Sequence, residues 1–175
     1  MKYKVCITAA GIGSRISTIS KINKALLPIK EKSILSKIIQ KIPEKIEIII
    51  AVGYQKEKIK DFVNIAHSDR NIKIVEIDNF NKKGSGPGYT LLSCKKYLNC
   101  PFIFIACDTL VKEKIPEPNK NWIGISTIDD PEPYLVVEKS KNNLVSRFFD
   151  KKSRNFLCWN GYKNFNCYCF IGLAG

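Results

Sequence analysis

The first two thirds of the chain alternate between continuous apolar runs and segments whose apolar residues recur at helical spacing. The apolar runs predict strands, most of them buried on both faces, over residues 4–10, 45–52, 71–77 and 101–107. The helical spacing predicts three helices, over residues 33–42, 55–66 and 88–98. Strands that alternate with helices are typical of a parallel sheet covered by helices on both faces.

The pattern changes after about residue 110. A polar, proline-containing connection leads to short apolar runs with no helices between them, at residues 122–128, 134–138, 144–149 and 168–173. We therefore expect an α/β chain with a Rossmann-like three-layer α/β/α fold. Its central sheet should be mostly parallel, and its C-terminal extension mixed or antiparallel.

Charge and length narrow the choice of partners. The 175 residues are 45% hydrophobic, which suits one domain, and the formal net charge is +13. This charge favours anionic partners, but the lysines are spread along the chain without a long like-charged block. The pattern indicates a lysine-rich solvated surface rather than a nucleic-acid-binding one.

The seven cysteines include no C-x-x-C pair, so neither a zinc ribbon nor a thioredoxin-type site is expected. Several of them lie in apolar runs, where a free cysteine behaves as a small hydrophobic residue. No apolar run is long enough for a membrane span, and no signal-peptide core follows the N-terminus. We expect reduced thiols, no membrane insertion and a cytoplasmic location.

A glycine-containing turn directly follows the first strand, in the sequence Ala9-Ala10-Gly11-Ile12-Gly13-Ser14-Arg15. Two glycines allow backbone N–H groups to point at an anion, and Ser14 and Arg15 add donors suited to phosphate oxygens. The turn lacks the third glycine of a dinucleotide fingerprint and the Gly-Lys-Ser/Thr of a Walker A loop. We expect nothing helical before about residue 33. An ordinary tight turn is the alternative interpretation.

Asp108 closes the strand predicted over residues 101–107. A carboxylate at this position can hold a hard cation against a phosphate, although a simple helix or turn cap is the alternative. Ligands of parallel α/β sheets bind at the carboxyl ends of the strands, where both Asp108 and the glycine turn are expected.

These motifs together with Asn23-Lys24-Ala25-Leu26-Leu27-Pro28 resemble the signature of the sugar-phosphate nucleotidyltransferases, in a C-terminally shortened form. The family usually has proline where this chain has Asn23. The resemblance implies that the nucleotide contacts Ala9, Ala10, Gly11, Gly13 and Ser14. It also implies that Arg15 and Lys24 hold phosphates and that Asp108 binds Mg²⁺, these three forming the catalytic set.

The resemblance also suggests two less specific contacts. Gly86 and Gly88 precede the third predicted helix, where the family reads the base, although a flexible loop would look the same. Lys151 matches the position of a lysine that meets the acceptor's phosphate, although a solvated turn is an equal alternative. His67, the only histidine, is expected on the surface.

The implied reaction transfers a nucleoside monophosphate from a nucleoside triphosphate, with CTP or UTP favoured, and releases pyrophosphate. The acceptor would be a phosphorylated sugar or a small alcohol such as phosphocholine, used for surface polysaccharide or glycoconjugate precursors. Residues 1–110 would form the nucleotide-binding half and residues 111–175 the acceptor-side half of a single domain. The chain stops within an apolar run and lacks the family's second metal-binding aspartate. We therefore expect a missing C-terminal segment, a partner domain or a homo-oligomer.

Three other functions stay open from the sequence. The first is a non-catalytic nucleotide-binding or regulatory domain, or a fragment of a larger transferase, which the missing second carboxylate favours. The second is a guanylyl- or cytidylyltransferase of a cofactor pathway, which would share the glycine, arginine and lysine positions. The third is nucleic-acid binding, which rests on net charge alone.

Overall fold

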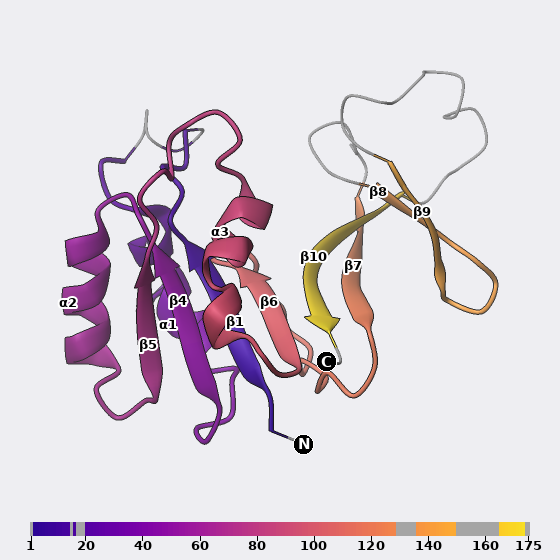
Figure 1. Ribbon diagram of the computed structural model, residues 1–175, viewed down its shortest axis with the longest axis horizontal. Helices are drawn as coiled ribbons and strands as arrows, with labels where there is room; N and C mark the ends of the chain where they lie inside the picture. The colour runs from indigo at the N-terminus through magenta and orange to yellow at the C-terminus, as the bar shows by residue number, and fades with distance from the viewer. Residues whose placement is uncertain (1, 15, 17–19, 129–135, 150–164, 174–175) are drawn as a thin grey trace. The chain divides into compact units, whose positions relative to one another are not determined.

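The computed structural model of the chain describes residues 2–14, 16, 20–128, 136–149 and 165–173. The fold divides into two compact units (Figure 1). The first unit comprises residues 1–122 with 172–175, and the second comprises residues 123–171.

The first unit contains a parallel sheet with the strand order β5-β4-β1-β6. The strands are β1 (Lys4–Ala9), β4 (Glu47–Val52), β5 (Ile72–Glu76) and β6 (Phe102–Ala106), close to the predicted ranges. The chain starts at β1, proceeds outward to β4 and β5, and then returns to place β6 on the other side of β1. The order of the strands therefore reverses between β1 and β6, and open α/β sheets commonly bind ligands at such a reversal. We call the carboxyl ends of these two strands the β1–β6 crevice.

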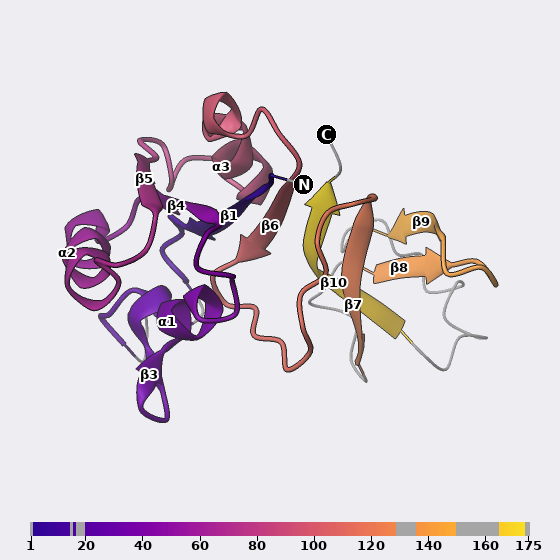
Figure 2. The same ribbon diagram turned by 90° about the horizontal axis from the view of Figure 1, so that it is seen from below.

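Three α-helices cover this sheet, α1 (Ile34–Ile39), α2 (Lys56–Ala66) and α3 (Pro87–Ser93). Figure 2 shows α3 on one face of the sheet and α1 and α2 on the other. The helix predicted over residues 88–98 is divided into α3 and a 3-10 turn, η2 (Lys95–Tyr97). The three-layer α/β/α arrangement is confirmed.

The alternation of side chains along the strands separates the core into two layers. On the face covered by α3, Cys6 and Ala10 pack with Ile49 and with Cys94 of the helix cap. The opposite layer contains fully buried aliphatic side chains of the sheet, α1 and α2, namely Ile7, Ile48, Ile50, Leu35, Ile39 and Ile59. Burial of each such side chain contributes about 1.5–3 kcal/mol, so the sheet is a firm base for the loops at its edge.

The connection between β1 and α1 contains structure that the sequence pattern did not predict. A 3-10 helix, η1 (Lys24–Leu26), precedes a small hairpin formed by β2 (Pro28–Ile29) and β3 (Lys32–Ser33). The expectation that nothing helical begins before residue 33 is therefore wrong. Asn23 starts η1 because its side-chain oxygen accepts a hydrogen bond from the Ala25 N–H at 2.9 Å.

His67 is buried, with 8% of its surface exposed, so its predicted surface location is wrong. It follows the last residue of α2, and its Nε2 lies 2.8 Å from the Ser36 hydroxyl of α1. Burial lowers the pKa of His67 below its usual 6.5. The Arg70 guanidinium donates to the carbonyls of Ile39 and Ile42, which further ties the end of α1 to this segment.

The second unit is made of antiparallel strands, as predicted for the C-terminal extension. Its strands are β7 (Trp122–Ile128), β8 (Val136–Lys139), β9 (Val145–Phe149) and β10 (Phe165–Leu173), except that Trp122 and the last two residues of β10 are assigned to the first unit. β8 pairs antiparallel with both β9 and β10, and β7 also pairs with β10. Across the part of the chain that the structure describes, no helix has the length and apolar character needed to cross a membrane.

Candidate functional site

The candidate site lies where β1 and β6 end, at the crevice defined by the reversal of strand order. The two strands stay paired up to their carboxyl ends, because Cys107 N–H donates to the Thr8 carbonyl at 3.3 Å. The segment that leaves β1 carries the glycine turn, and the segment that leaves β6 carries Asp108. Open α/β sheets bind ligands in this position.

Lys24 and Asp108 meet at this crevice although 84 positions separate them in the sequence. The Lys24 Nζ lies 2.8 Å from Asp108 Oδ2. The lysine side chain is 22% exposed and the aspartate side chain 53%, so both groups are accessible to a ligand. The structure thus brings together the predicted phosphate-binding cation and the predicted metal-binding carboxylate.

Gly13 brings the glycine turn against the same lysine. Its φ of +69° lies in the left-handed region, which favours glycine. A Cβ at this position would lie 3.5 Å from Lys24 Cδ, in ordinary contact with the lysine stem. Gly11 and Ser14 are exposed in the same turn, while Arg15 lies outside the described residues. The turn, Lys24 and Asp108 therefore form one accessible polar corner.

Ala9 and Ala10 take part in this corner through their backbone carbonyls rather than through their side chains. Both side chains are buried in the core. The Ala10 carbonyl accepts a hydrogen bond from Tyr54 N–H at 2.9 Å, and the Ala9 carbonyl accepts from Asn23 Nδ2 at 3.5 Å. The base contacts expected of these two alanines stay predictions.

Gly86 and Gly88 lie at the start of α3, in the connection that follows β5. Because the strands are parallel, this connection leaves the sheet at the same edge as the glycine turn. A Cβ at either glycine would meet nothing within 4 Å, so the backbone there is open to approach. Their role at the base stays a prediction, and Lys151 lies outside the described residues.

Asn23 and Gln55 are two site residues that the sequence reasoning did not select. The Asn23 side chain donates to the Tyr54 carbonyl at 2.8 Å, and its backbone N–H donates to Gln55 Oε1 at 2.8 Å. Both contacts connect the residue before Lys24 to the turn that follows β4. The one sign of this role in the sequence was that Asn23 stands where the family usually has proline.

Cys107 stands directly before Asp108 and is buried. Burial raises the pKa of its thiol to about 11, so the thiol is neutral at physiological pH and is no nucleophile there. The four cysteines whose state the structure describes are free: Cys6, Cys94, Cys100 and Cys107.

The donor set suits a magnesium ion that arrives with a nucleotide. Within the described residues, no group of three or more His, Cys, Asp or Glu side chains could hold a metal ion on its own. Mg²⁺ is commonly held by one or two carboxylates together with substrate phosphates and water. Asp108 is one accessible carboxylate of this kind, and its only recorded ion-pair partner among the described residues is Lys24, a phosphate-binding type of side chain.

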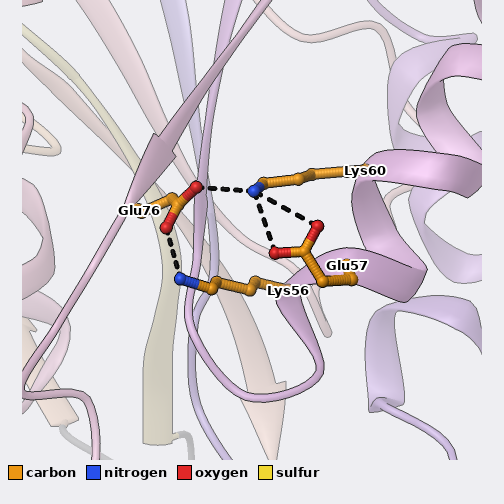
Figure 3. Close-up of polar contacts among 4 residues, drawn as sticks. All are labelled: Lys56, Glu57, Lys60 and Glu76. Atoms are coloured by element: carbon orange, nitrogen blue, oxygen red, sulfur yellow. Dashed lines mark hydrogen bonds and ion pairs between the residues drawn. The ribbon is translucent and has the colours of Figure 1, made fainter.

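A second group of lysines and carboxylates lies at the carboxyl end of β5 (Figure 3). Glu76 contacts Lys56 through one carboxylate oxygen and Lys60 through the other, and Lys60 also contacts Glu57 at 3.0 Å. The two lysines lower the pKa of Glu76 to about 2. We call these four residues the α2–β5 ion network.

The layered sheet of this chain matches the fold of solved nucleotidyltransferases. A crystal structure of a UDP-glucose pyrophosphorylase in complex with UDP-glucose superposes with a TM-score of 0.77 at 20% identity, over 99% of this chain and 76% of that one. The CTP:phosphocholine cytidylyltransferase LicC from Streptococcus pneumoniae also gives 0.77, at 17% identity, over 100% of this chain and 72% of that one.

The chain belongs to the family described as Domain of unknown function (DUF6564), whose model matches residues 24–130. It is also 32% identical over 158 residues to the bifunctional protein GlmU of Methanococcus maripaludis strain C5. That match covers 88% of this chain and 37% of the relative, so the chain spans little more than a third of such curated relatives. The resemblance to the sugar-phosphate nucleotidyltransferases is thereby confirmed.

Proposed function

We propose that this chain transfers a nucleoside monophosphate from a nucleoside triphosphate to a phosphorylated small molecule and releases pyrophosphate. The observation that carries the proposal is the Lys24–Asp108 contact at the β1–β6 crevice, beside the left-handed turn at Gly13. A cation, a carboxylate and an open backbone turn at one corner are the groups that a metal-bound triphosphate requires.

The reaction needs no covalent enzyme intermediate. An oxygen of the acceptor's phosphate attacks the α-phosphorus in line, and a new P–O bond forms. The bond to the β-phosphate oxygen breaks, and pyrophosphate leaves with that electron pair. Lys24 would exchange its contact with Asp108 for phosphate oxygens, and Arg15 would add a second cation from the same turn. Asp108 would hold Mg²⁺, whose charge neutralises the phosphates.

For the substrates we favour UTP or CTP, with a phosphorylated sugar or a small alcohol such as phosphocholine as acceptor. Support comes from the pyrimidine nucleotides named for the pyrophosphorylase and the cytidylyltransferase of the same fold. The products would serve as precursors of surface polysaccharides or glycoconjugates. Gly86 and Gly88 are our candidates for contact with the base, and Lys151 for contact with the acceptor's phosphate.

The test is a grid of four nucleoside triphosphates against phosphorylated acceptors, with Mg²⁺ present and pyrophosphate release as the readout. We expect release for one pyrimidine nucleotide with one acceptor class, and none without acceptor or with EDTA. Reactions that give no pyrophosphate in any cell of the grid, from folded protein, would overturn the proposal.

A second candidate is nucleotide binding without transfer. It is favoured by the isolation of Asp108, which belongs to no larger group of potential metal ligands among the described residues. The same grid separates the two functions when nucleotide binding is measured by calorimetry in parallel. Binding of a triphosphate without pyrophosphate from any acceptor would support the second candidate.

A further inference from the structure

We infer that Asn23 and Gln55 form a polar brace that holds Lys24 in position to contact a triphosphate. Neither residue is proposed to touch the substrate, so both are positioning residues. The inference rests on the proposed function, because it concerns the lysine assigned there to the phosphates. It is argued from hydrogen bonds and backbone conformation within the chain itself.

Asn23 is fully buried, with no exposed surface. Its Nδ2 donates to the carbonyls of Tyr54 at 2.8 Å and of Ala9 at 3.5 Å, and its Oδ1 accepts from Ala25 N–H at 2.9 Å. One side chain thus connects the end of β1, the turn after β4 and the first turn of η1. A buried amide with these partners specifies one arrangement of the three segments.

Gln55 supplies the other half of the brace. Its backbone adopts φ 53° and ψ 38°, a left-handed conformation that is unfavourable for a residue with a Cβ. It precedes α2 but makes no side-chain capping bond to that helix. Instead its Oε1 accepts from Asn23 N–H at 2.8 Å and its Nε2 donates to the Lys21 carbonyl at 2.6 Å. The side chain therefore serves the loop before Lys24 rather than its own helix.

Lys24 follows the braced residue directly, and this limits where its ammonium group can lie. Asn23 has φ −55° and ψ 134°, a backbone conformation that a proline ring would also hold. In this chain hydrogen bonds supply the constraint. A lysine side chain has a flexible four-carbon stem. Fixing its backbone therefore reduces the conformational entropy that is lost when the ammonium group binds a phosphate. The ammonium group of Lys24 lies 2.8 Å from Asp108 Oδ2.

The replacement Gln55→Gly separates positioning from stability. Glycine accepts the left-handed conformation without strain, which offsets the loss of the side-chain hydrogen bonds, so we expect the urea midpoint of unfolding to stay close to that of the parent protein. It also removes both side-chain bonds of the brace. We therefore expect kcat/KM for pyrophosphate release to fall about 10-fold. Asn23→Ser, which keeps a capping oxygen but loses the amide donor, should act in the same direction.

Two readouts test position rather than general integrity. In limited acetylation with N-acetoxysuccinimide, without nucleotide, Lys24 should react faster in both variants relative to exposed Lys45. In a double-mutant cycle, Gln55→Gly should change kcat/KM by less than about twofold once Lys24→Met is present. Ser20→Ala is the matched control, since it removes an exposed bond to Ile22 N–H of the same loop but no bond of the brace.

The inference is overturned if Lys24 acetylation is unchanged in both variants, or if the losses from Gln55→Gly and Lys24→Met multiply. It is also overturned if Gln55→Gly lowers the urea midpoint and activity together. A parent protein that releases no pyrophosphate would refute the proposed function alone. The acetylation measurement would still decide whether the brace holds Lys24.

Discussion

Two lysine–carboxylate groups lie at the carboxyl ends of strands in this sheet, and they differ in what surrounds them. In the α2–β5 ion network, Glu76 contacts two lysines with its two oxygens, and both lysines come from α2 (Figure 3). At the β1–β6 crevice, Asp108 pairs through a single oxygen with Lys24 and with no other cation among the described residues. The lysine there is the first residue of η1, which the buried Asn23 caps.

If the proposed function holds, this difference means that pairing of charges alone does not mark a functional site. Exposed ion pairs are weak and screened by salt, and the α2–β5 network has the features of such a surface cluster. The Lys24–Asp108 pair is distinguished by its place at the reversal of strand order and by a rigid support. Lys24 contacts one carboxylate oxygen of Asp108, and the other oxygen could serve as a ligand for a metal ion.

The largest expected difference between the two groups is in catalysis. Lys24→Met and Asp108→Asn should each lower kcat for pyrophosphate release by about 10²–10³-fold, because Lys24 would contact the transferring phosphates and Asp108 would hold the Mg²⁺ that neutralises them. The matched variants Lys60→Met and Glu76→Gln should change kcat by less than about twofold, since exposed pairs away from a site contribute little. Initial rates at saturating substrates measure both sets.

Circular dichroism on all four variants serves as the folding control for these rates. An equal loss of activity in both groups would remove the distinction between them. Near-parental turnover in Lys24→Met would remove the lysine from the proposed reaction.

The second prediction concerns Gly53, which directly follows β4 and packs closely against the end of β1. A Cβ at Gly53 would lie 2.8 Å from the Ala10 carbonyl and 2.7 Å from the Phe80 ring. Gly53→Ala should therefore lower the free energy of unfolding by about 1–3 kcal/mol. It should also lower kcat/KM, because it separates the two strand ends that Asn23 connects. Urea denaturation and pyrophosphate assays measure the two effects.

Gly11→Ala is the matched control for stability, because a Cβ at Gly11 would meet nothing within 4 Å. We expect its urea midpoint to stay near that of the parent. If Gly53→Ala and Gly11→Ala have the same stability, close backbone approach is not what requires glycine after β4.

Most of the fold could be predicted because hydrophobic periodicity reports burial. The fully buried isoleucines of β4 form an uninterrupted apolar run, and the turns of α2 place Ile59 and Val63 on its buried side. Short elements were missed where a single polar contact decides the structure. The turn η1 depends on the Asn23 cap, and no apolar pattern announces a three-residue helix.

The charged residues of the candidate site could be predicted from the sequence, but the hydrogen bonds that hold them in place could not. Lys24 and Asp108 carry recognisable groups, and the topology brings them together. The buried His67 and the brace residue Gln55 could not be found in this way. Their roles arise from contacts with Ser36 and Asn23, more than 30 positions away along the chain. Tertiary contacts of this kind leave no periodic signal in the sequence.

The smallest expected effect is on acid stability, and it belongs to the α2–β5 network. The pKa of Glu76 is lowered from its usual 4.5 to about 2, chiefly by Lys56 and Lys60. Its contribution to stability is therefore complete above about pH 4.5 and is lost as the pH falls through about 2. Glu76→Gln should make the urea midpoint fall less steeply with pH across this window, whereas Glu44→Gln, at an exposed position, should not.

Because the network is exposed, 1 M NaCl should reduce the difference in urea midpoint between Glu76→Gln and the parent. Equal slopes for parent and Glu76→Gln at low salt would show that the network contributes nothing measurable.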